Sequence, residues 1–192
     1  EDWLFPALPP RLERLDLNGL DGMCWLPAFP ATLGALYCVG TPAFPMRVNI
    51  ESLPATMDTI RMEYVYDIDW GGACTVDDLR FLGGYYALAV PPITCGEIHF
   101  TDLDFSSLDL SAVSTPLVEM QGGAVTGTIR WPPDATVIYV GGLNLTGSLG
   151  AWPITLQHLS MEVWNNMCIP LLPDILEDFH FLTWDNGAEL CM

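Results

Sequence analysis

An apolar motif that recurs about every 20 residues constrains this chain more than any other feature. Two apolar residues flank one variable residue in each copy, as in Leu15 and Leu17 or Leu36 and Cys38. Such alternation places both apolar residues on one face of a β-strand. A single short strand cannot bury that face alone, so the copies must stack. The first apolar residues lie at 15, 36, 60, 79, 98, 118, 138, 159 and 179, in steps of 19 to 24 residues. The spacing therefore predicts a solenoid with a parallel sheet along one side.

The segments before the strands carry a second pattern, in which proline follows a large apolar residue. The clearest copies begin at Leu8, Phe29, Leu53, Trp131, Trp152 and Leu172. Proline disfavours a helix on the return path. The frequent turn residues, 17 Gly and 16 Pro, agree with short strands and bends. We therefore expect extended or 3₁₀ segments opposite the sheet, with little α-helix.

The combined pattern L-P-x-x-L-x-x-L-x-L resembles a leucine-rich repeat. Two copies, residues 125–129 and 145–149, add V-T-G-T-I and L-T-G-S-L, which are similar to the repeats of protozoan, kinetoplastid-type surface antigens and of plant receptors. The resemblance implies a curved, horseshoe-like solenoid of about nine repeats over residues 1–192. It also implies a recognition domain whose concave sheet binds a protein or glycan. Residues 165–192 are similar to the disulfide caps of extracellular arrays, which implies a Cys168–Cys191 bridge.

The asparagine that normally follows the strand in leucine-rich repeats is missing. Its positions hold Leu20, Thr41, Val65, Gly84, Leu103, Gly123, Leu143, Trp164 and Trp184. Either the turn backbone finds other hydrogen-bond partners, or the register shifts beyond the strand. A parallel β-helix remains the rival solenoid.

The charge balance excludes two classes of partner. The chain has 24 acidic residues and 6 basic ones, all arginine, for a net charge of −18. Nothing in it could neutralise a run of phosphates, so we exclude nucleic acid and disfavour anionic membrane surfaces. No uninterrupted apolar run of about 18 residues predicts a transmembrane helix.

The six cysteines point to an oxidising compartment. They are spread out, form no CxxC motif and have no histidine placed so as to suggest a zinc knuckle, which favours disulfides over a metal. Cys74 and Cys95 lie on adjacent copies and predict one bridge, and Cys24–Cys38 follows by elimination. Asn144 begins an N-glycosylation sequon. We therefore expect an extracellular or cell-surface protein, with any signal peptide or lipid anchor outside this chain. Six reduced core thiols in a cytosolic protein are the alternative.

The strand residues that point outward form the predicted binding face. Three of the six arginines and all three histidines occupy these positions. Arginine and tyrosine are typical of binding hot spots, so Arg61 and Arg80 are expected to meet an anionic group. The alternative is a solvated face on which Arg61 pairs with Glu63 and Arg80 with Asp78. The predicted ligand-binding residues are Tyr37, Arg61, Arg80, His99, Glu119, Tyr139 and His180.

No catalytic, metal or cofactor motif is present in the sequence. His99 lies three and four copies from His158 and His180, too far for one metal centre, and the nearest candidate pair, His158 with His180, is one copy apart. Acidic pairs such as Asp102 and Asp104 could serve a carbohydrate-active β-solenoid enzyme, but solvated turns explain them more simply. We therefore predict a non-enzymatic recognition domain without cofactors. A structural coat component without a defined ligand is the first alternative, and a β-solenoid enzyme is the second.

Overall fold

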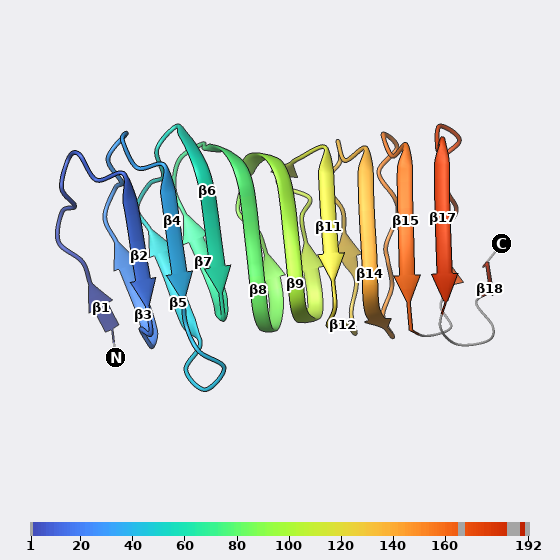
Figure 1. The fold of residues 1–192 in the computed structure, drawn as a ribbon, viewed down its shortest axis with the longest axis horizontal. Helices are drawn as coiled ribbons and strands as arrows, with labels where there is room; N and C mark the ends of the chain where they lie inside the picture. The colour runs from blue at the N-terminus through green and yellow to red at the C-terminus, as the bar shows by residue number, and fades with distance from the viewer. Residues whose placement is uncertain (1, 165–167, 184–188, 191–192) are drawn as a thin grey trace.

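The computed structural model describes residues 2–164, 168–183 and 189–190. This part of the chain forms a parallel β-solenoid of about nine coils and contains no helix (Figure 1). It accordingly contains no helix that is long and apolar enough to cross a bilayer. The first and last coils lie at opposite ends of the stack. A solenoid, the class that includes both architectures allowed by the repeat, is therefore confirmed.

One side of the solenoid is a continuous sheet, here called the front sheet. Its main strands are parallel, and each pairs with the strand of the next coil. Leu36 pairs with Leu15 and Ile60, and the same alignment continues to Leu159 and Phe179. These pairs fall at the positions that the repeat predicts. The strands are β2 (Arg14–Asn18), β4 (Ala35–Val39), β6 (Thr56–Glu63), β8 (Thr75–Ala89), β9 (Ile93–Asp109), β11 (Leu117–Gln121), β14 (Val137–Leu145), β15 (His158–Val163) and β17 (Asp178–Thr183).

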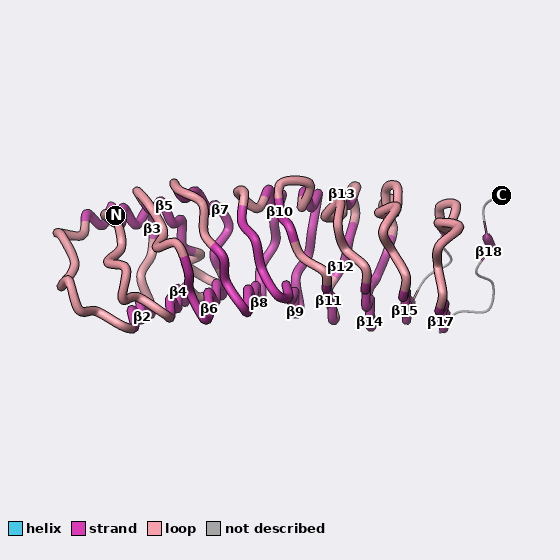
Figure 2. The backbone as a smooth tube through the Cα atoms, turned by 90° about the horizontal axis from the view of Figure 1, so that it is seen from above, coloured by secondary structure: helices cyan, strands magenta, loops and turns pink. Residues whose placement is uncertain are grey.

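The opposite side, here called the back, changes along the stack (Figure 2). Its first half is a second parallel sheet of β1 (Asp2–Leu4), β3 (Gly22–Leu26), β5 (Met46–Ile50) and β7 (Val65–Trp70). Strands β8 and β9 are long enough to run from the front to the back, and they pair at both. Beyond them, within the described part of the chain, the end of β14 pairs with the two-residue strand β12 (Ala124–Val125). The other strands there are also two residues long: β10 (Val113–Ser114), which pairs with the start of β9, β13 (Ile129–Arg130) and β16 (Cys168–Ile169), the last paired with β18 (Glu189–Leu190). The back is thus extended and non-helical, as predicted.

The core lies between the two sides and runs the length of the stack. The inward front residues Ile60, Leu79, Ile98, Val118 and Ile138 are fully buried. Like side chains stack on one another from coil to coil, so each coil covers the apolar surface of the next. Aromatic residues do the same at two places: the rings of Phe81 and Phe100 and those of Trp131 and Trp152 are each stacked with centroids 5.3 Å apart.

The proline motif forms a tight turn at one edge of the front sheet. Leu33 N donates to Pro30 O at 3.0 Å, and Leu156 N donates to Pro153 O at 3.2 Å, which closes a four-residue turn in each coil. The threonine inside the motif ties that turn to the previous coil, because the Thr32 hydroxyl donates to Leu12 O at 2.9 Å. The motif is therefore a repeated turn with its own link between coils.

The opposite edge explains how the fold dispenses with the expected asparagine. There the backbone of one coil bonds the backbone of the next: Gly19 N donates to Val39 O, Gly40 N to Glu63 O and Tyr64 N to Leu82 O, at 2.8 to 2.9 Å. The turn donors are satisfied by backbone carbonyls, which leaves no task for an asparagine side chain. The register within the front strands is as predicted, but just beyond them it shifts in one coil, where Gly141 pairs with Glu162 and Leu143 with Val163.

The two internal disulfide predictions are wrong, because Cys24, Cys38, Cys74 and Cys95 are buried free thiols. In the sheet Cys95 pairs with Val76, two residues beyond Cys74. That offset adds roughly 7 Å along the strand to the 4.8 Å between strands, more than a disulfide can span. Cys24 lies on the back strand β3 and Cys38 on the front strand β4, so the core separates their backbones. Cys191 lies outside the described residues, as do residues 165–167, 184–188 and 192 of the predicted cap at 165–192, so the predicted Cys168–Cys191 bridge stays a prediction.

Candidate functional site

The outward side chains of the front sheet form aligned rows across the coils. The central row pairs Tyr37 with Arg61, Arg61 with Arg80 and Arg80 with His99. It continues through Glu119 and Tyr139 to Ser160 and His180. Each of these residues stands between two inward apolar neighbours, and the two-residue period of a strand turns it outward. All seven predicted ligand-binding residues therefore lie in one row on one face.

The arginines of this face already form ion pairs with carboxylates of the same strands. Arg80 Nε lies 2.9 and 2.7 Å from the two oxygens of Asp78, and Arg61 Nη2 lies 3.0 Å from Glu63 Oε2. The hydrogen bond that Arg80 donates to Asp78 raises the pKa of Arg80 above its usual value. These are the two pairs that a solvated face predicts. An anionic ligand would therefore compete with a carboxylate that already neutralises each guanidinium group.

The face as a whole is negative. Its three outward rows hold three arginines and seven carboxylates, which amounts to a formal charge of −4 with neutral histidines. Arg14, at the first coil, bonds Asp16 at 2.9 Å and lies over the Tyr37 ring, 4.2 Å from its centroid. The predicted excess of cations on this face is real, but neighbouring carboxylates outnumber them.

Four residues in the middle of the front sheet, here called the His99 cluster, bring an imidazole among three carboxylates. Glu119 Oε2 lies 2.9 Å from His99 Nδ1, and Glu97 Oε1 lies 3.2 Å from Nε2. Asp78 Oδ1 is 4.0 Å from Nε2. Strand pairing assembles the group, because Asp78 pairs with Glu97 and His99 pairs with Glu119.

A shallow hollow of about 250 Å³ lies beside the His99 cluster. Arg80 and His99 line one side of it, and Glu119 and Gln121 line the other. Gln121 Nε2 donates to Glu119 Oε1, which fixes the carboxylate that faces His99. Of the cluster, His99 and Glu119 line this hollow, whereas Asp78 and Glu97 are not among its lining residues.

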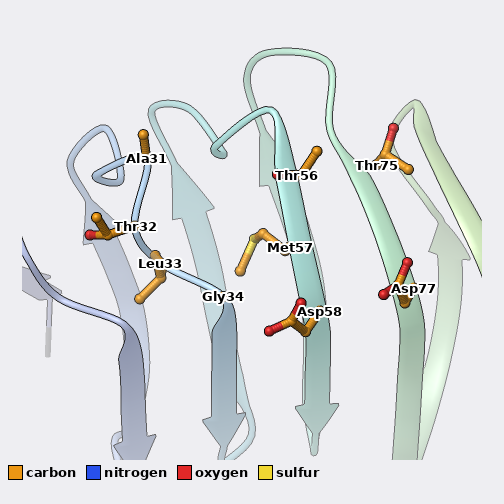
Figure 3. A pocket seen from close by; sticks show the side chains of 9 residues that line it. All are labelled: Ala31, Thr32, Leu33, Gly34, Thr56, Met57, Asp58, Thr75 and Asp77. Atoms are coloured by element: carbon orange, nitrogen blue, oxygen red, sulfur yellow. The ribbon is translucent and has the colours of Figure 1, made fainter.

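Two further hollows lie at the edges of the solenoid. One, of about 250 Å³, is lined by threonine and aspartate side chains at the proline turns, including Thr32, Asp58 and Asp77 (Figure 3). The other, of about 480 Å³, lies at the opposite edge. Its lining comprises Pro42, Pro45, Tyr64, Tyr66, Gly84, Asp102 and Asp104.

The larger edge hollow also holds two non-glycine residues in the left-handed backbone region. Tyr64 has φ 51° and Asp102 has φ 54°. Left-handed conformations of such residues cost free energy and cluster at functional sites. From the sequence, Asp102 belongs to an acidic pair that either serves a β-solenoid enzyme or forms a solvated turn, and Tyr64 is not among the predicted site residues.

No family model matches the chain, and no curated protein or solved structure is significantly similar to it. The argument for function therefore depends on the geometry of this molecule and on its sequence pattern.

The sequence analysis placed Asp78 and Glu97 on the binding face but not among the binding residues. The predicted register could have revealed the cluster, because it sets Asp78 beside Glu97, one row from His99.

His158 and His180 lie on neighbouring strands, and His180 Nδ1 is 3.4 Å from the Ser160 hydroxyl. The sequon residue Asn144 is exposed at the end of β14.

Proposed function

We propose that this chain is a non-enzymatic recognition domain whose front sheet binds a basic segment of a partner protein. The observation that carries the proposal is the −4 formal charge of the front face, which stands in aligned rows on a continuous sheet. Complementary charge steers association and selects partners. Tyr37 and Tyr139 supply contact area at either side of the charged centre, and Tyr139 is 45% exposed.

The proposal includes the leucine-rich-repeat class, the horseshoe curvature and an extracellular location. The repeated motif and the parallel register support the class. The exposed sequon asparagine, Asn144, supports secretion. The free thiols at 24, 38, 74 and 95 remove one of the original arguments for an oxidising compartment.

The basic partner is tested by reversing charge on the front sheet while leaving the His99 cluster intact. In the Glu63→Arg/Glu162→Arg variant we expect at least about tenfold weaker binding of a lysine- and arginine-rich peptide. The control Asp69→Arg/Asp174→Arg makes the same change of net charge at exposed positions outside the front rows and should bind like the original chain. Isothermal titration calorimetry at two salt concentrations measures both.

An anionic ligand gives the opposite pattern. If heparin binds and the Arg61→Glu/Arg80→Glu variant loses it, the basic-partner proposal is wrong and the original interpretation of these arginines is right. If neither probe binds, the structural-coat alternative gains weight.

A glycan is a second candidate ligand, favoured by the larger edge hollow. Its volume of about 480 Å³ is in the range of small-molecule sites. Tyrosine rings offer flat faces to a sugar, while Asp102 and Asp104 offer acceptors for hydroxyl groups. Arg47 lies over the Tyr66 ring, 5.1 Å from its centroid, and bonds Asp67 at 3.2 Å, which braces this ring. A glycan array compares the chain with Tyr66→Ala, and only loss of a hit in the variant supports the candidate.

A further inference from the structure

We propose that His99, Glu97 and Asp78 bind a divalent first-row transition-metal ion, with Zn²⁺ as the best match. One ligand atom from each residue lies within 4.8 Å of the other two. Imidazole nitrogen with carboxylate oxygen is a donor set that Zn²⁺ accepts, whereas Ca²⁺ and Mg²⁺ prefer oxygen alone. The sequence analysis assigned no metal ligand, and this inference does not depend on the proposed partner.

The hydrogen bond to Glu119 orients the imidazole for this task. A carboxylate only accepts hydrogen bonds, so the Glu119 contact at 2.9 Å places a proton on His99 Nδ1. In the neutral ring Nε2 then carries a lone pair. Metal-binding histidines are commonly held in this way, with the other ring nitrogen donating to a carboxylate. Glu119 is therefore a positioning residue and not a ligand.

The second ring nitrogen faces oxygen atoms that cannot donate to it. Nε2 is buried and has no hydrogen-bond partner among the described residues. Glu97 Oε1 lies 3.2 Å away and Asp78 Oδ1 lies 4.0 Å away, yet neither contact is a hydrogen bond. A lone pair and two carboxylates that converge repel each other unless a proton on Nε2 or a metal cation lies between them.

The distances suit a metal ion with small adjustments. Zn–N and Zn–O bonds of about 2.1 Å place tetrahedral ligand atoms roughly 3.4 Å apart. The Nε2–Glu97 distance of 3.2 Å is close to that value, and the 4.0 Å to Asp78 needs only a small side-chain movement.

The local charge also matches a dication. Asp78, Glu97 and Glu119 carry three negative charges and Arg80 carries one positive charge, so the formal charge of the group is −2. Arg80 approaches both oxygens of Asp78 through Nε, but each carboxylate oxygen has a second lone pair. Removing the guanidinium charge should therefore tighten metal binding.

The test is titration of the chelator-treated chain with Zn²⁺ by calorimetry and with Co²⁺ by visible absorption. We expect one saturable site with ligand-field bands from Co²⁺. Affinity should fall at least about 100-fold in His99→Gln and about 10- to 100-fold in Glu119→Gln. It should rise in Arg80→Met. The controls His158→Gln and His180→Gln remove histidines from the same sheet and should bind like the original chain.

Three results would overturn the site: no saturable binding of Zn²⁺, binding that survives in His99→Gln, or equal binding of Ca²⁺. Glu97→Gln gives an independent variant if His99→Gln does not fold. Nitrogen-15 NMR of the unmodified chain adds a test without mutation. Zn²⁺ should shift the Nε2 resonance of His99, and a resonance that stays protonated in excess Zn²⁺ would show that a proton alone occupies the cluster.

Discussion

The front and the back of this solenoid are made by the same coils, yet only the front is uniform. Every coil contributes a front strand in the same register, whereas the back is a four-stranded sheet in the first half and mostly turns in the second. Back strand β5 alternates strictly, with Met46, Val48 and Ile50 buried. The later segments break off at Gly127 and Gly147, after two strand residues or at the end of β14. Alternating apolar residues are therefore not sufficient to form a back strand. A strand also ends where neighbouring coils approach too closely to leave room for a side chain.

The largest loss of stability is expected at the back turns of the second half of the solenoid, where the backbones of neighbouring coils are in contact. A Cβ added at Gly127 would lie 1.6 Å from the backbone oxygen of Ser106, and one at Gly147 would lie 2.0 Å from Gly127 O. Gly127→Ala should thus destabilise the fold by about 3 kcal/mol. The same methyl added in the front strand at Gly141→Ala would meet atoms no closer than 3.9 Å, and it should leave stability unchanged or slightly higher. Urea unfolding of the two variants measures the contrast, and equal midpoints would contradict it.

On the second half of the back, where the strands are short, we expect side-chain hydrogen bonds to link successive coils in place of strand pairing. Buried Trp131 Nε1 donates to Leu149 O at 2.6 Å and so links successive coils. Trp131→Phe keeps a ring for stacking on Trp152 but leaves that carbonyl without its donor, which should cost about 2 kcal/mol. Trp25→Phe, at a half-exposed position of the first-half back sheet, is the control and should change stability by less than about 0.5 kcal/mol. Thermal unfolding distinguishes the two, and a larger loss in the control would refute the contrast.

The buried thiols of both sides should make the fold sensitive to alkali. Burial raises the pKa of Cys95 on the front and of Cys24 on the back to about 11. The unfolded thiol ionises first, so stability is full below the ordinary thiol pKa and falls as the pH rises toward 11. The loss should be about 1–2 kcal/mol per thiol near pH 10. Denaturant titrations from pH 7 to 11 should show a shallower fall in Cys95→Ala, and an unchanged slope would contradict the assignment.

The same thiols can be counted directly. In a Cys168→Ser/Cys191→Ser variant, the remaining four cysteines should resist a thiol reagent while folded and react in denaturant without reductant. Two thiols or none would restore the bridges that the sequence analysis predicted.

The smallest effect is expected at an exposed turn that joins β9 to β10 on the back. Hydrogen bonds from Ser111, supported by Arg130, hold the pKa of Asp109 below its usual value. Its contribution is therefore present above the ordinary carboxyl pKa and is lost as the pH falls through the folded value. Asp109→Asn should lower stability at pH 7 by less than about 1 kcal/mol and flatten the acid limb. An acid limb that matches the original chain would remove this role.

Several structural features were predictable from residues alone. A side-chain period of two means that a slip by one residue would turn every apolar residue outward. The spacing from Leu15 to Phe179 therefore determined the front register, and with it the row from Tyr37 to His180. The absence of helix followed from the proline turns. The repeat did not reveal which back segments would pair as strands.

The cysteines show why local pattern was insufficient elsewhere. Cys74 and Cys95 lie on neighbouring coils, as the repeat indicated, but whether they can bond depends on an offset along the strand. Cys24 and Cys38 lie on opposite sides of the core. Neither separation can be derived from the spacing of the cysteines in the sequence, because both depend on how the coil bends between its two sides.

The His99 cluster shows most clearly what the repeat predicts and what the folded chain adds. Strand alternation and a constant repeat length leave one register, and this register puts Asp78, Glu97, His99 and Glu119 on one face. That Glu119 contacts Nδ1 and that Nε2 faces the other two carboxylates is known from the folded structure alone. Those contacts depend on side-chain rotamers, which packing across neighbouring strands selects and which no one-dimensional period encodes.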